Sequence, residues 1–64
     1  MKREKLIRSR QIMCFSVSDM AKNVGISRNY YRQIEAGKRN PSLVTTFSIL
    51  RVLDSADINI FKKI

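Results

Sequence analysis

The stretch SVSDMAKNVGISRNYYRQIEAGKRNPS, residues 16–42, decides the fold. Ser16 and Asp19 stand three residues apart at its start, which is the spacing of a capping box at the beginning of a helix. Apolar side chains then recur at helical spacing over 17–24. Gly25 follows, and glycine ends helices because it adopts the left-handed backbone conformation without strain. The pattern therefore predicts a short helix over these eight residues.

Helices are also predicted on both sides of this one. Ser27 is a typical N-cap residue, and the helix that it begins runs to about Ala36. Gly37 ends that helix in the same way as Gly25 ends the helix over 17–24. Upstream, residues 2–13 are rich in Lys, Arg, Glu, Leu, Gln and Met, which all favour helix.

The remaining third of the chain is predicted to be helical as well. Pro41 suits the first turn of a helix that runs to about Leu53, because proline has no amide to lose there. A final short helix is expected over about 57–64, capped by Asp57. Apolar side chains at helical spacing in the longer helix are predicted to line one buried face, with Val44 and Ile49 beside them: Leu43, Phe47, Leu50 and Leu53.

Length and composition limit the possible functions. The chain has 64 residues, which is enough for one domain, and the helical pattern makes it an all-α domain of four to five helices over residues 1–64. With no His and a single Cys, zinc-finger, thiol–imidazole and disulfide-framework proteins are excluded. We expect no enzyme, no metal and no cofactor. Cys14 fits a reducing, cytoplasmic location, and no apolar run approaches the roughly 18 residues that span a membrane.

The charge points to a polyanionic partner. Thirteen Lys or Arg residues against five Asp or Glu residues give a net charge of +8. Residues 1–40 contain ten of the basic residues and three of the acidic residues, so the binding surface is expected in the first two-thirds of the chain. Four basic residues near the N-terminus are interpreted as a solvated face that adds non-specific attraction for a polyanion: Lys2, Arg3, Lys5 and Arg8.

The predicted helix after Ser27 has one polar face that suits DNA. At about 100° per residue, four polar side chains share that face and two apolar ones lie opposite. Tyr31 and Ile34 are the apolar pair, and the polar set is Arg28, Asn29, Arg32 and Gln33. Arg matches the guanine edge and Asn or Gln the adenine edge in the major groove. An ordinary solvated helix face is the alternative interpretation.

A wider set of residues resembles a known family, the Cro and phage-repressor type of helix-turn-helix proteins, also called the XRE family. The matching positions are Ala21, Gly25, Ile26, Ser27, Ile34 and Glu35, followed by Gly37-Lys38-Arg39-Asn40-Pro41-Ser42. The resemblance covers about Leu6 to Leu53. It implies a compact lambda-repressor-like domain of four to five helices, with the motif at about 17–36.

The spacing of these positions also has a physical reason. Ala21 lies where the two helices of the motif approach most closely, so a larger side chain would push them apart. Gly25 supplies the reversal that sets them at about 90–120°. Tyr31 departs from the family, which carries a smaller aliphatic residue there, and we expect it to tilt the helix or to leave its hydroxyl at the surface.

The resemblance further implies a DNA-binding transcriptional regulator, with a bacterial or phage origin and a repressor role. Its second motif helix would enter the major groove, where Arg28, Asn29 and Gln33 read bases and Arg32 contacts a base or a phosphate. Val17 stands where the family often has Gln, which shifts one phosphate contact to nearby hydroxyls and amides. The implied phosphate-binding residues are Ser16, Ser18, Ser27, Tyr30, Lys38, Arg39 and Arg10.

Three of these assignments leave alternatives open. Tyr30 is as well explained by plain exposure, and Lys38 with Arg39 by a solvated basic loop. Arg10 and Glu35 occupy positions at which the family forms an ion pair between its first and third helices. Glu35 would then have a structural role, like Ala21, Gly25, Ile34 and Gly37. Arg10 would hold the third helix in place, and the electric field of its positive charge would face DNA.

The C-terminal helix raises the question of partners. Its apolar stripe, Ile58, Phe61 and Ile64 with Ile60 to one side, is partly core and otherwise a candidate dimer contact. We therefore expect double-stranded DNA as partner and a homodimer on a pseudo-palindromic operator, with no membrane association. Two alternatives remain: the regulator of a toxin–antitoxin or restriction–modification operon, and a protein–protein adaptor or antirepressor that reuses the fold.

Overall fold

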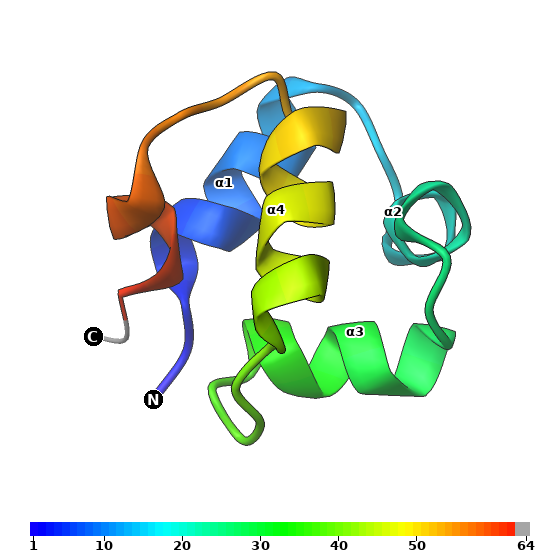
Figure 1. Ribbon diagram of the computed structural model, residues 1–64, viewed down its shortest axis with the longest axis vertical. Helices are drawn as coiled ribbons and strands as arrows, with labels where there is room; N and C mark the ends of the chain where they lie inside the picture. Colours follow the sequence, from blue (N-terminus) through cyan, green and yellow to red (C-terminus); the bar gives the residue numbers. More distant parts are fainter. Residues whose placement is uncertain (63–64) are drawn as a thin grey trace.

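A computed structural model describes residues 1–62, which form four α-helices and one 3-10 helix and contain no strand (Figure 1). In chain order the elements are α1 (Glu4–Ile12), α2 (Val17–Val24), α3 (Arg28–Glu35), α4 (Leu43–Val52) and η1 (Ile58–Phe61). Figure 1 shows α4 upright in the centre, α3 crossing its lower end, and α1 and α2 on either side. The expectation of an all-α domain is confirmed.

The local signals of the motif are present. The Ser16 hydroxyl accepts the Asp19 amide at 3.0 Å, and the Asp19 carboxylate accepts the Ser16 amide at the same distance. Gly25 has a φ of +85°, and an added Cβ there would meet no atom within 4 Å. Backbone conformation rather than crowding therefore requires glycine at this turn.

The boundaries of α3 and α4 depend on serine caps. The Ser27 hydroxyl accepts the Tyr30 amide at 3.1 Å and begins α3. Ser42 accepts the Thr45 amide at 3.1 Å, so α4 begins at Leu43 and Pro41 lies outside it. The prediction that Pro41 occupies the first turn was wrong because the cap comes one residue later.

The core lies between α4 and the other elements. Its buried hydrophobic members come from every element: Leu6, Met20, Ala21, Tyr31, Ile34, Ile49, Leu50, Leu53 and Ile60. Ala21 is 3% exposed and belongs to α2, which packs on both α3 and α4. Ala21 is therefore buried on the packed side of α2, and its place at the closest approach of the two motif helices stays a prediction.

The predicted buried face of α4 is wrong in its N-terminal half. Leu43, Val44 and Phe47 are 70%, 75% and 60% exposed. Thr45 takes the buried position instead, where its hydroxyl pairs with that of Ser42 at 2.9 Å. Residues two apart lie on roughly opposite sides of a helix, at about 100° per residue, so burying Thr45 turns its neighbours outward.

The C-terminal segment also differs from its prediction. It forms a single 3-10 turn beside α1 instead of a longer helix, and Ile60 is its buried side chain. Ile58 is exposed and Phe61 is half-buried, while Ile64 lies outside the described residues. Ile60, which was expected to one side of the apolar stripe, is therefore the side chain that enters the core, and the dimer role of Ile58, Phe61 and Ile64 stays a prediction.

Tyr31 is fully buried, so of the two alternatives expected for this residue the surface hydroxyl is wrong. Its hydroxyl forms no hydrogen bond with any of the residues that the structure describes. Burial, and after it the Glu35 carboxylate, raises the pKa of Tyr31 well above its ordinary value. The side chain therefore contributes apolar contacts at the cost of a desolvated hydroxyl.

We expect Tyr31→Phe to leave the free energy of unfolding at pH 7 unchanged or to raise it by about 1 kcal/mol, because it removes an unpaired buried hydroxyl. Above about pH 10 the phenol ionises in the unfolded chain but stays protonated in the folded one, so wild type loses stability as pH rises. The variant should lose less. Urea unfolding at both pH values measures this, with Tyr30→Phe as control. A loss above about 1 kcal/mol at pH 7 would show that the hydroxyl is paired in solution.

Candidate nucleic-acid interface

One side of α3 is free and the other is held in the core. Tyr31, Ile34 and Glu35 are buried, which fixes the rotation of the helix about its axis. The four polar residues predicted to share a face are on the solvent side: Arg28, Asn29 and Arg32 are exposed, and Gln33 is half-buried. The structure thus brings this set together on one element.

The loop after α3 adds two cations beside this face. Lys38 lines a shallow hollow with Asn29, Arg32 and Gln33. Arg39 lines a second one with Ser27, Asn29, Tyr30 and Gln33. The backbone amides of Lys38 and Arg39 both donate to the Gln33 carbonyl, at 3.0 and 3.3 Å. The loop therefore folds back against α3 instead of extending into solvent.

Within residues 1–62, these cations have no carboxylate partners. The ion pair found within residues 1–62 joins Arg10 to Glu35, on the inner side of the domain. Charge around the α3 face is therefore uncompensated and positive, carried by Arg28, Arg32, Lys38 and Arg39. A surface of this kind attracts polyanions.

Tyr30 is neither free nor fully buried. It packs partly against the core, and its own backbone amide is held by the Ser27 cap. Its edge lines the hollow that contains Arg39. The side chain therefore borders the polar face, as the sequence placed it, with one side in contact with the core.

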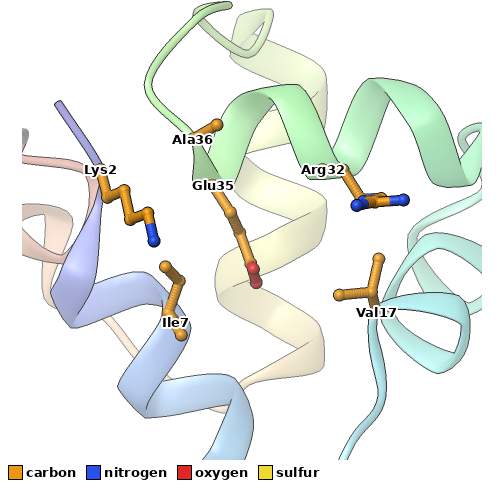
Figure 2. A pocket seen from close by; sticks show the side chains of 6 residues that line it. All are labelled: Lys2, Ile7, Val17, Arg32, Glu35 and Ala36. Atoms are coloured by element: carbon orange, nitrogen blue, oxygen red, sulfur yellow. The ribbon is translucent and has the colours of Figure 1, made fainter.

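The N-terminus of α2 lies close to Arg32. Figure 2 shows the Arg32 side chain pointing toward Val17, the first residue of α2, across a hollow of about 180 Å³. Lys2 enters the same hollow from the other side of Glu35. Ser16 and Ser18 are exposed nearby in sequence. Arg32 thus lies beside the helix end, where free amides favour anions, and Lys2 lies across the hollow from it.

The capping box leaves part of this helix end available. The Ser16 amide lowers the pKa of the Asp19 carboxyl, so the carboxylate is charged at neutral pH and keeps the cap closed. The Ser16 hydroxyl accepts a bond from Asp19 and retains its own proton for donation. Ser16 and Ser18 can therefore both donate to a phosphate.

The expected ion pair between the first and third helices is present. Arg10 Nε lies 2.7 Å from Glu35 Oε2, and the two side chains are 12% and 8% exposed. A further Arg10 nitrogen donates to the Phe15 carbonyl at 2.8 Å. Bonding to Glu35 raises the pKa of Arg10. The guanidinium is thus engaged inside the domain, where it joins α1 to α3.

Arg3 has a role that the sequence did not indicate. It was interpreted as one of several solvated N-terminal cations, but it is 3% exposed. Its guanidinium donates to the carbonyls of Ile34 at 2.6 Å, Arg39 at 2.9 Å and Phe61 at 2.8 Å. It also donates to the Asn40 side-chain oxygen at 2.7 Å. The interpretation as a solvated cation was therefore wrong.

The acceptors of Arg3 explain how a charge can be buried there. All four are neutral oxygens, and burial lowers the pKa of Arg3. An arginine nevertheless stays charged in proteins. The Ile34 carbonyl belongs to the last turn of α3, where carbonyls lack helical partners and the helix dipole is negative. The Arg3 amide also donates to the Glu35 carbonyl at 2.8 Å. Arg3 therefore caps the end of α3.

The same contacts hold the basic loop. Arg39 and Asn40 are bound by Arg3 directly, so the loop that carries Lys38 is tied to α3 and to the C-terminal turn. No residue pattern near Arg3 could have shown this, because its partners lie 31 to 58 positions away. A buried arginine thus sets the position of the loop cations relative to the α3 face.

Within the part of the chain that is described, no cluster of three His, Cys, Asp or Glu side chains could hold a metal ion. None of the described helices has the length and apolar character needed to cross a bilayer.

Comparison with known proteins agrees with this geometry. A family model described as helix-turn-helix matches residues 3–59. The match begins at Arg3 and includes all four α-helices. No curated protein and no solved structure gives a significant match.

We expect Arg3→Ala to lower the free energy of unfolding by about 2–4 kcal/mol, because it removes charged hydrogen bonds and leaves carbonyl oxygens unpaired. Lys2→Ala is the matched control, since Lys2 is an exposed neighbour with the same charge. Urea unfolding of both variants measures the difference. Equal, small effects of the two substitutions would contradict a structural role for Arg3.

Proposed function

Because the chain belongs to the helix-turn-helix family of the Cro and phage-repressor type, a family of DNA-binding regulators, we propose that it is a transcriptional repressor that binds a pseudo-palindromic operator. Its fold is the compact lambda-repressor-like all-α arrangement. The repressor acts by occupying DNA that overlaps a promoter. Its place in the cell is then the cytoplasm, on the nucleoid.

One observation carries the proposal: the solvent side of α3 combines base-reading side chains with uncompensated cations. Arg28 offers the paired donors that match guanine O6 and N7. Asn29 and Gln33 offer the donor and acceptor that match adenine N6 and N7. Arg32 borders both this face and the start of α2, which suits contact with a base or a phosphate.

The phosphate contacts surround this face. Lys38 and Arg39 lie at one end, held against α3 by Arg3. Ser16 and Ser18 lie at the start of α2, whose free amides bind anions. The remaining contacts are assigned to Ser27 and Tyr30, which line the hollow containing Arg39. Arg10 serves this interface indirectly, through the ion pair that holds α3.

The regulator is proposed to act as a homodimer on DNA. Proteins with this motif read two half-sites whose centres are about 34 Å apart. The principal extents of the domain are 25, 22 and 21 Å between Cα atoms, so one copy covers one half-site. A second copy on the next turn would lie on the same side of the duplex.

In vitro selection from random duplex DNA at near-physiological salt tests this function. We expect an enriched inverted repeat with half-site centres about ten base pairs apart. Enrichment of a single half-site would support sequence-specific DNA binding but contradict the homodimer. A pool without enrichment would contradict operator binding and favour a protein–protein adaptor on the same fold.

We expect Arg28→Ala to weaken operator binding by about 1–3 kcal/mol and to relax preference at one base position. The reason is that Arg28 projects from the solvent side of α3 with paired donors. Fluorescence anisotropy measures both effects. It is carried out on the operator and on duplexes in which each position in turn carries each of the four base pairs. An equal loss of affinity on all sequences would indicate that Arg28 contacts a phosphate and not a base.

Lys38→Ala should behave differently, because Lys38 lies in the loop and not on α3. We expect it to weaken binding to all sequences alike and to reduce the slope of log affinity against log salt by about one. Lys5→Ala provides a comparison, because Lys5 is an exposed basic residue on α1. An unchanged affinity and slope in Lys38→Ala would remove this residue from the interface.

A further inference from the structure

We infer that the C-terminal turn η1 and the basic loop after α3 are coupled through Arg3, so that a docked η1 favours DNA binding by the loop and an open η1 weakens it. The inference rests on the proposed function, because it concerns the phosphate contacts of Lys38 and Arg39. It gives a regulatory role to η1, to which the proposed function assigns no DNA contact. Arg3 is then a positioning residue for DNA binding.

The guanidinium of Arg3 lies between the turn and the loop. Its Nε donates to the Phe61 carbonyl at 2.8 Å. Its terminal nitrogens donate to the loop, at 2.9 Å to the Arg39 carbonyl and at 2.7 Å to the Asn40 side-chain oxygen. A guanidinium is planar and carries its donors in a fixed fork, so the positions of these acceptors are linked to one another. A shift of the turn therefore disturbs the bonds that hold the loop.

Burial makes this link cooperative. Arg3 is 3% exposed, so water has little access to Nε while the guanidinium stays in place. A buried charged donor that loses its acceptor costs more free energy than a neutral one. None of the carboxylates within residues 1–62 forms an ion pair with Arg3. Opening of the turn therefore drives the guanidinium toward water, which breaks its bonds to the loop as well.

The turn itself is suited to local opening. η1 consists of four residues, and the hydrogen bonds of a 3-10 turn are less well aligned than those of an α-helix. Ile60 is its one buried side chain, with the half-buried Phe61 packed beside the core. Segments with few buried apolar contacts open at a lower free energy than the whole domain unfolds. η1 can therefore open while the four α-helices stay folded.

The second half of the loop depends on Arg3. The first half is held to α3, because the amides of Lys38 and Arg39 donate to the Gln33 carbonyl at 3.0 and 3.3 Å. From there to the Ser42 cap of α4, the hydrogen bonds found within residues 1–62 are the two that Arg3 donates. Loss of these bonds frees the backbone that carries the Arg39 side chain, and with it a phosphate contact.

The coupling acts in both directions. η1 packs beside α1, on the side of the domain away from α2, and lies outside the proposed DNA surface (Figure 1). Coupling free energies between two sites are reciprocal, so a docked turn that favours DNA binding is itself favoured by bound DNA. DNA binding should therefore reduce the opening of η1 without touching it.

Amide hydrogen exchange of the wild-type chain tests the coupling without any substitution. Exchange is measured by NMR on the protein alone and on its complex with the duplex obtained by selection. The amides of Ile60 and Lys62 donate to carbonyls of the turn and its cap, at 3.3 and 3.0 Å, so both report its opening. The Ser55 amide is the control, because it donates at 2.9 Å to the Leu50 carbonyl, away from Arg3.

We expect DNA to slow exchange at Ile60 and Lys62 by about 5- to 150-fold relative to Ser55, the usual range for coupled sites. Arg3→Lys should remove this difference, because an ammonium keeps the charge but lacks the planar fork. Equal slowing at all three amides, or none, would overturn the inference while leaving DNA binding intact. Failure of wild type to select any duplex would instead contradict the proposed function.

DNA binding by variants of the turn provides a second measurement. Ile60→Ala loosens η1, and the matched control Leu53→Ala removes a side chain of similar burial from the end of α4, 6% exposed against 5%. Both variants keep the net charge of +8, so a change in the salt dependence of binding cannot come from a lost charge.

We expect Ile60→Ala to weaken binding to all sequences alike and to reduce the slope of log affinity against log salt by about one, because the released loop loses a phosphate contact. Leu53→Ala should keep the slope of wild type. Fluorescence anisotropy on the selected duplex, over a series of salt concentrations, measures both slopes. An unchanged slope in Ile60→Ala, or an equal decrease in Leu53→Ala, would overturn the inference.

Discussion

The buried guanidinium of Arg3 is the interaction on which the arrangement of this small domain depends. It joins the N-terminal segment to the end of α3, to the basic loop and to the C-terminal turn through four hydrogen bonds of 2.6–2.9 Å. None of the carboxylates within residues 1–62 forms an ion pair with it. Its charge is stabilised by neutral oxygens, among them the Ile34 carbonyl at the negative end of the α3 dipole. A domain of 64 residues has little core to spare, so one such junction matters more here than in a larger protein.

Two arginines of the N-terminal region thus hold α3 from the side away from solvent. Arg3 binds its last carbonyls, and Arg10 binds the Glu35 carboxylate at 2.7 Å. Tyr31 of the same helix is fully buried in the core, with its phenol near Glu35 and Arg10. These contacts involve the inner side and the C-terminal end of the helix, so the face bearing Arg28 stays free. The same contacts place the basic loop beside that face, which links folding directly to the proposed reading of DNA.

Short-range features could be predicted from the sequence, and long-range ones could not. The helix ends at Ser16 and Gly25 depend on residues within four positions, so their pattern was sufficient. The role of Arg3 depends on backbone carbonyls up to 58 residues away, and carbonyls carry no sequence signal. The buried face of α4 was misassigned because Thr45 pairs its hydroxyl locally and can enter the core. Phe47 is then left outside, where apolar periodicity alone does not separate a core from an interface between chains.

The central claim is that the solvent side of α3, with the basic loop and the start of α2, is the surface that meets DNA. The most direct measurement is a titration of ¹⁵N-labelled protein with the selected duplex, followed by amide chemical shifts. We expect the largest changes at residues 16–18, 27–33 and 38–40, with little change over 8–12 of α1. Changes concentrated on α1 and η1, with the α3 amides unaffected, would contradict the account.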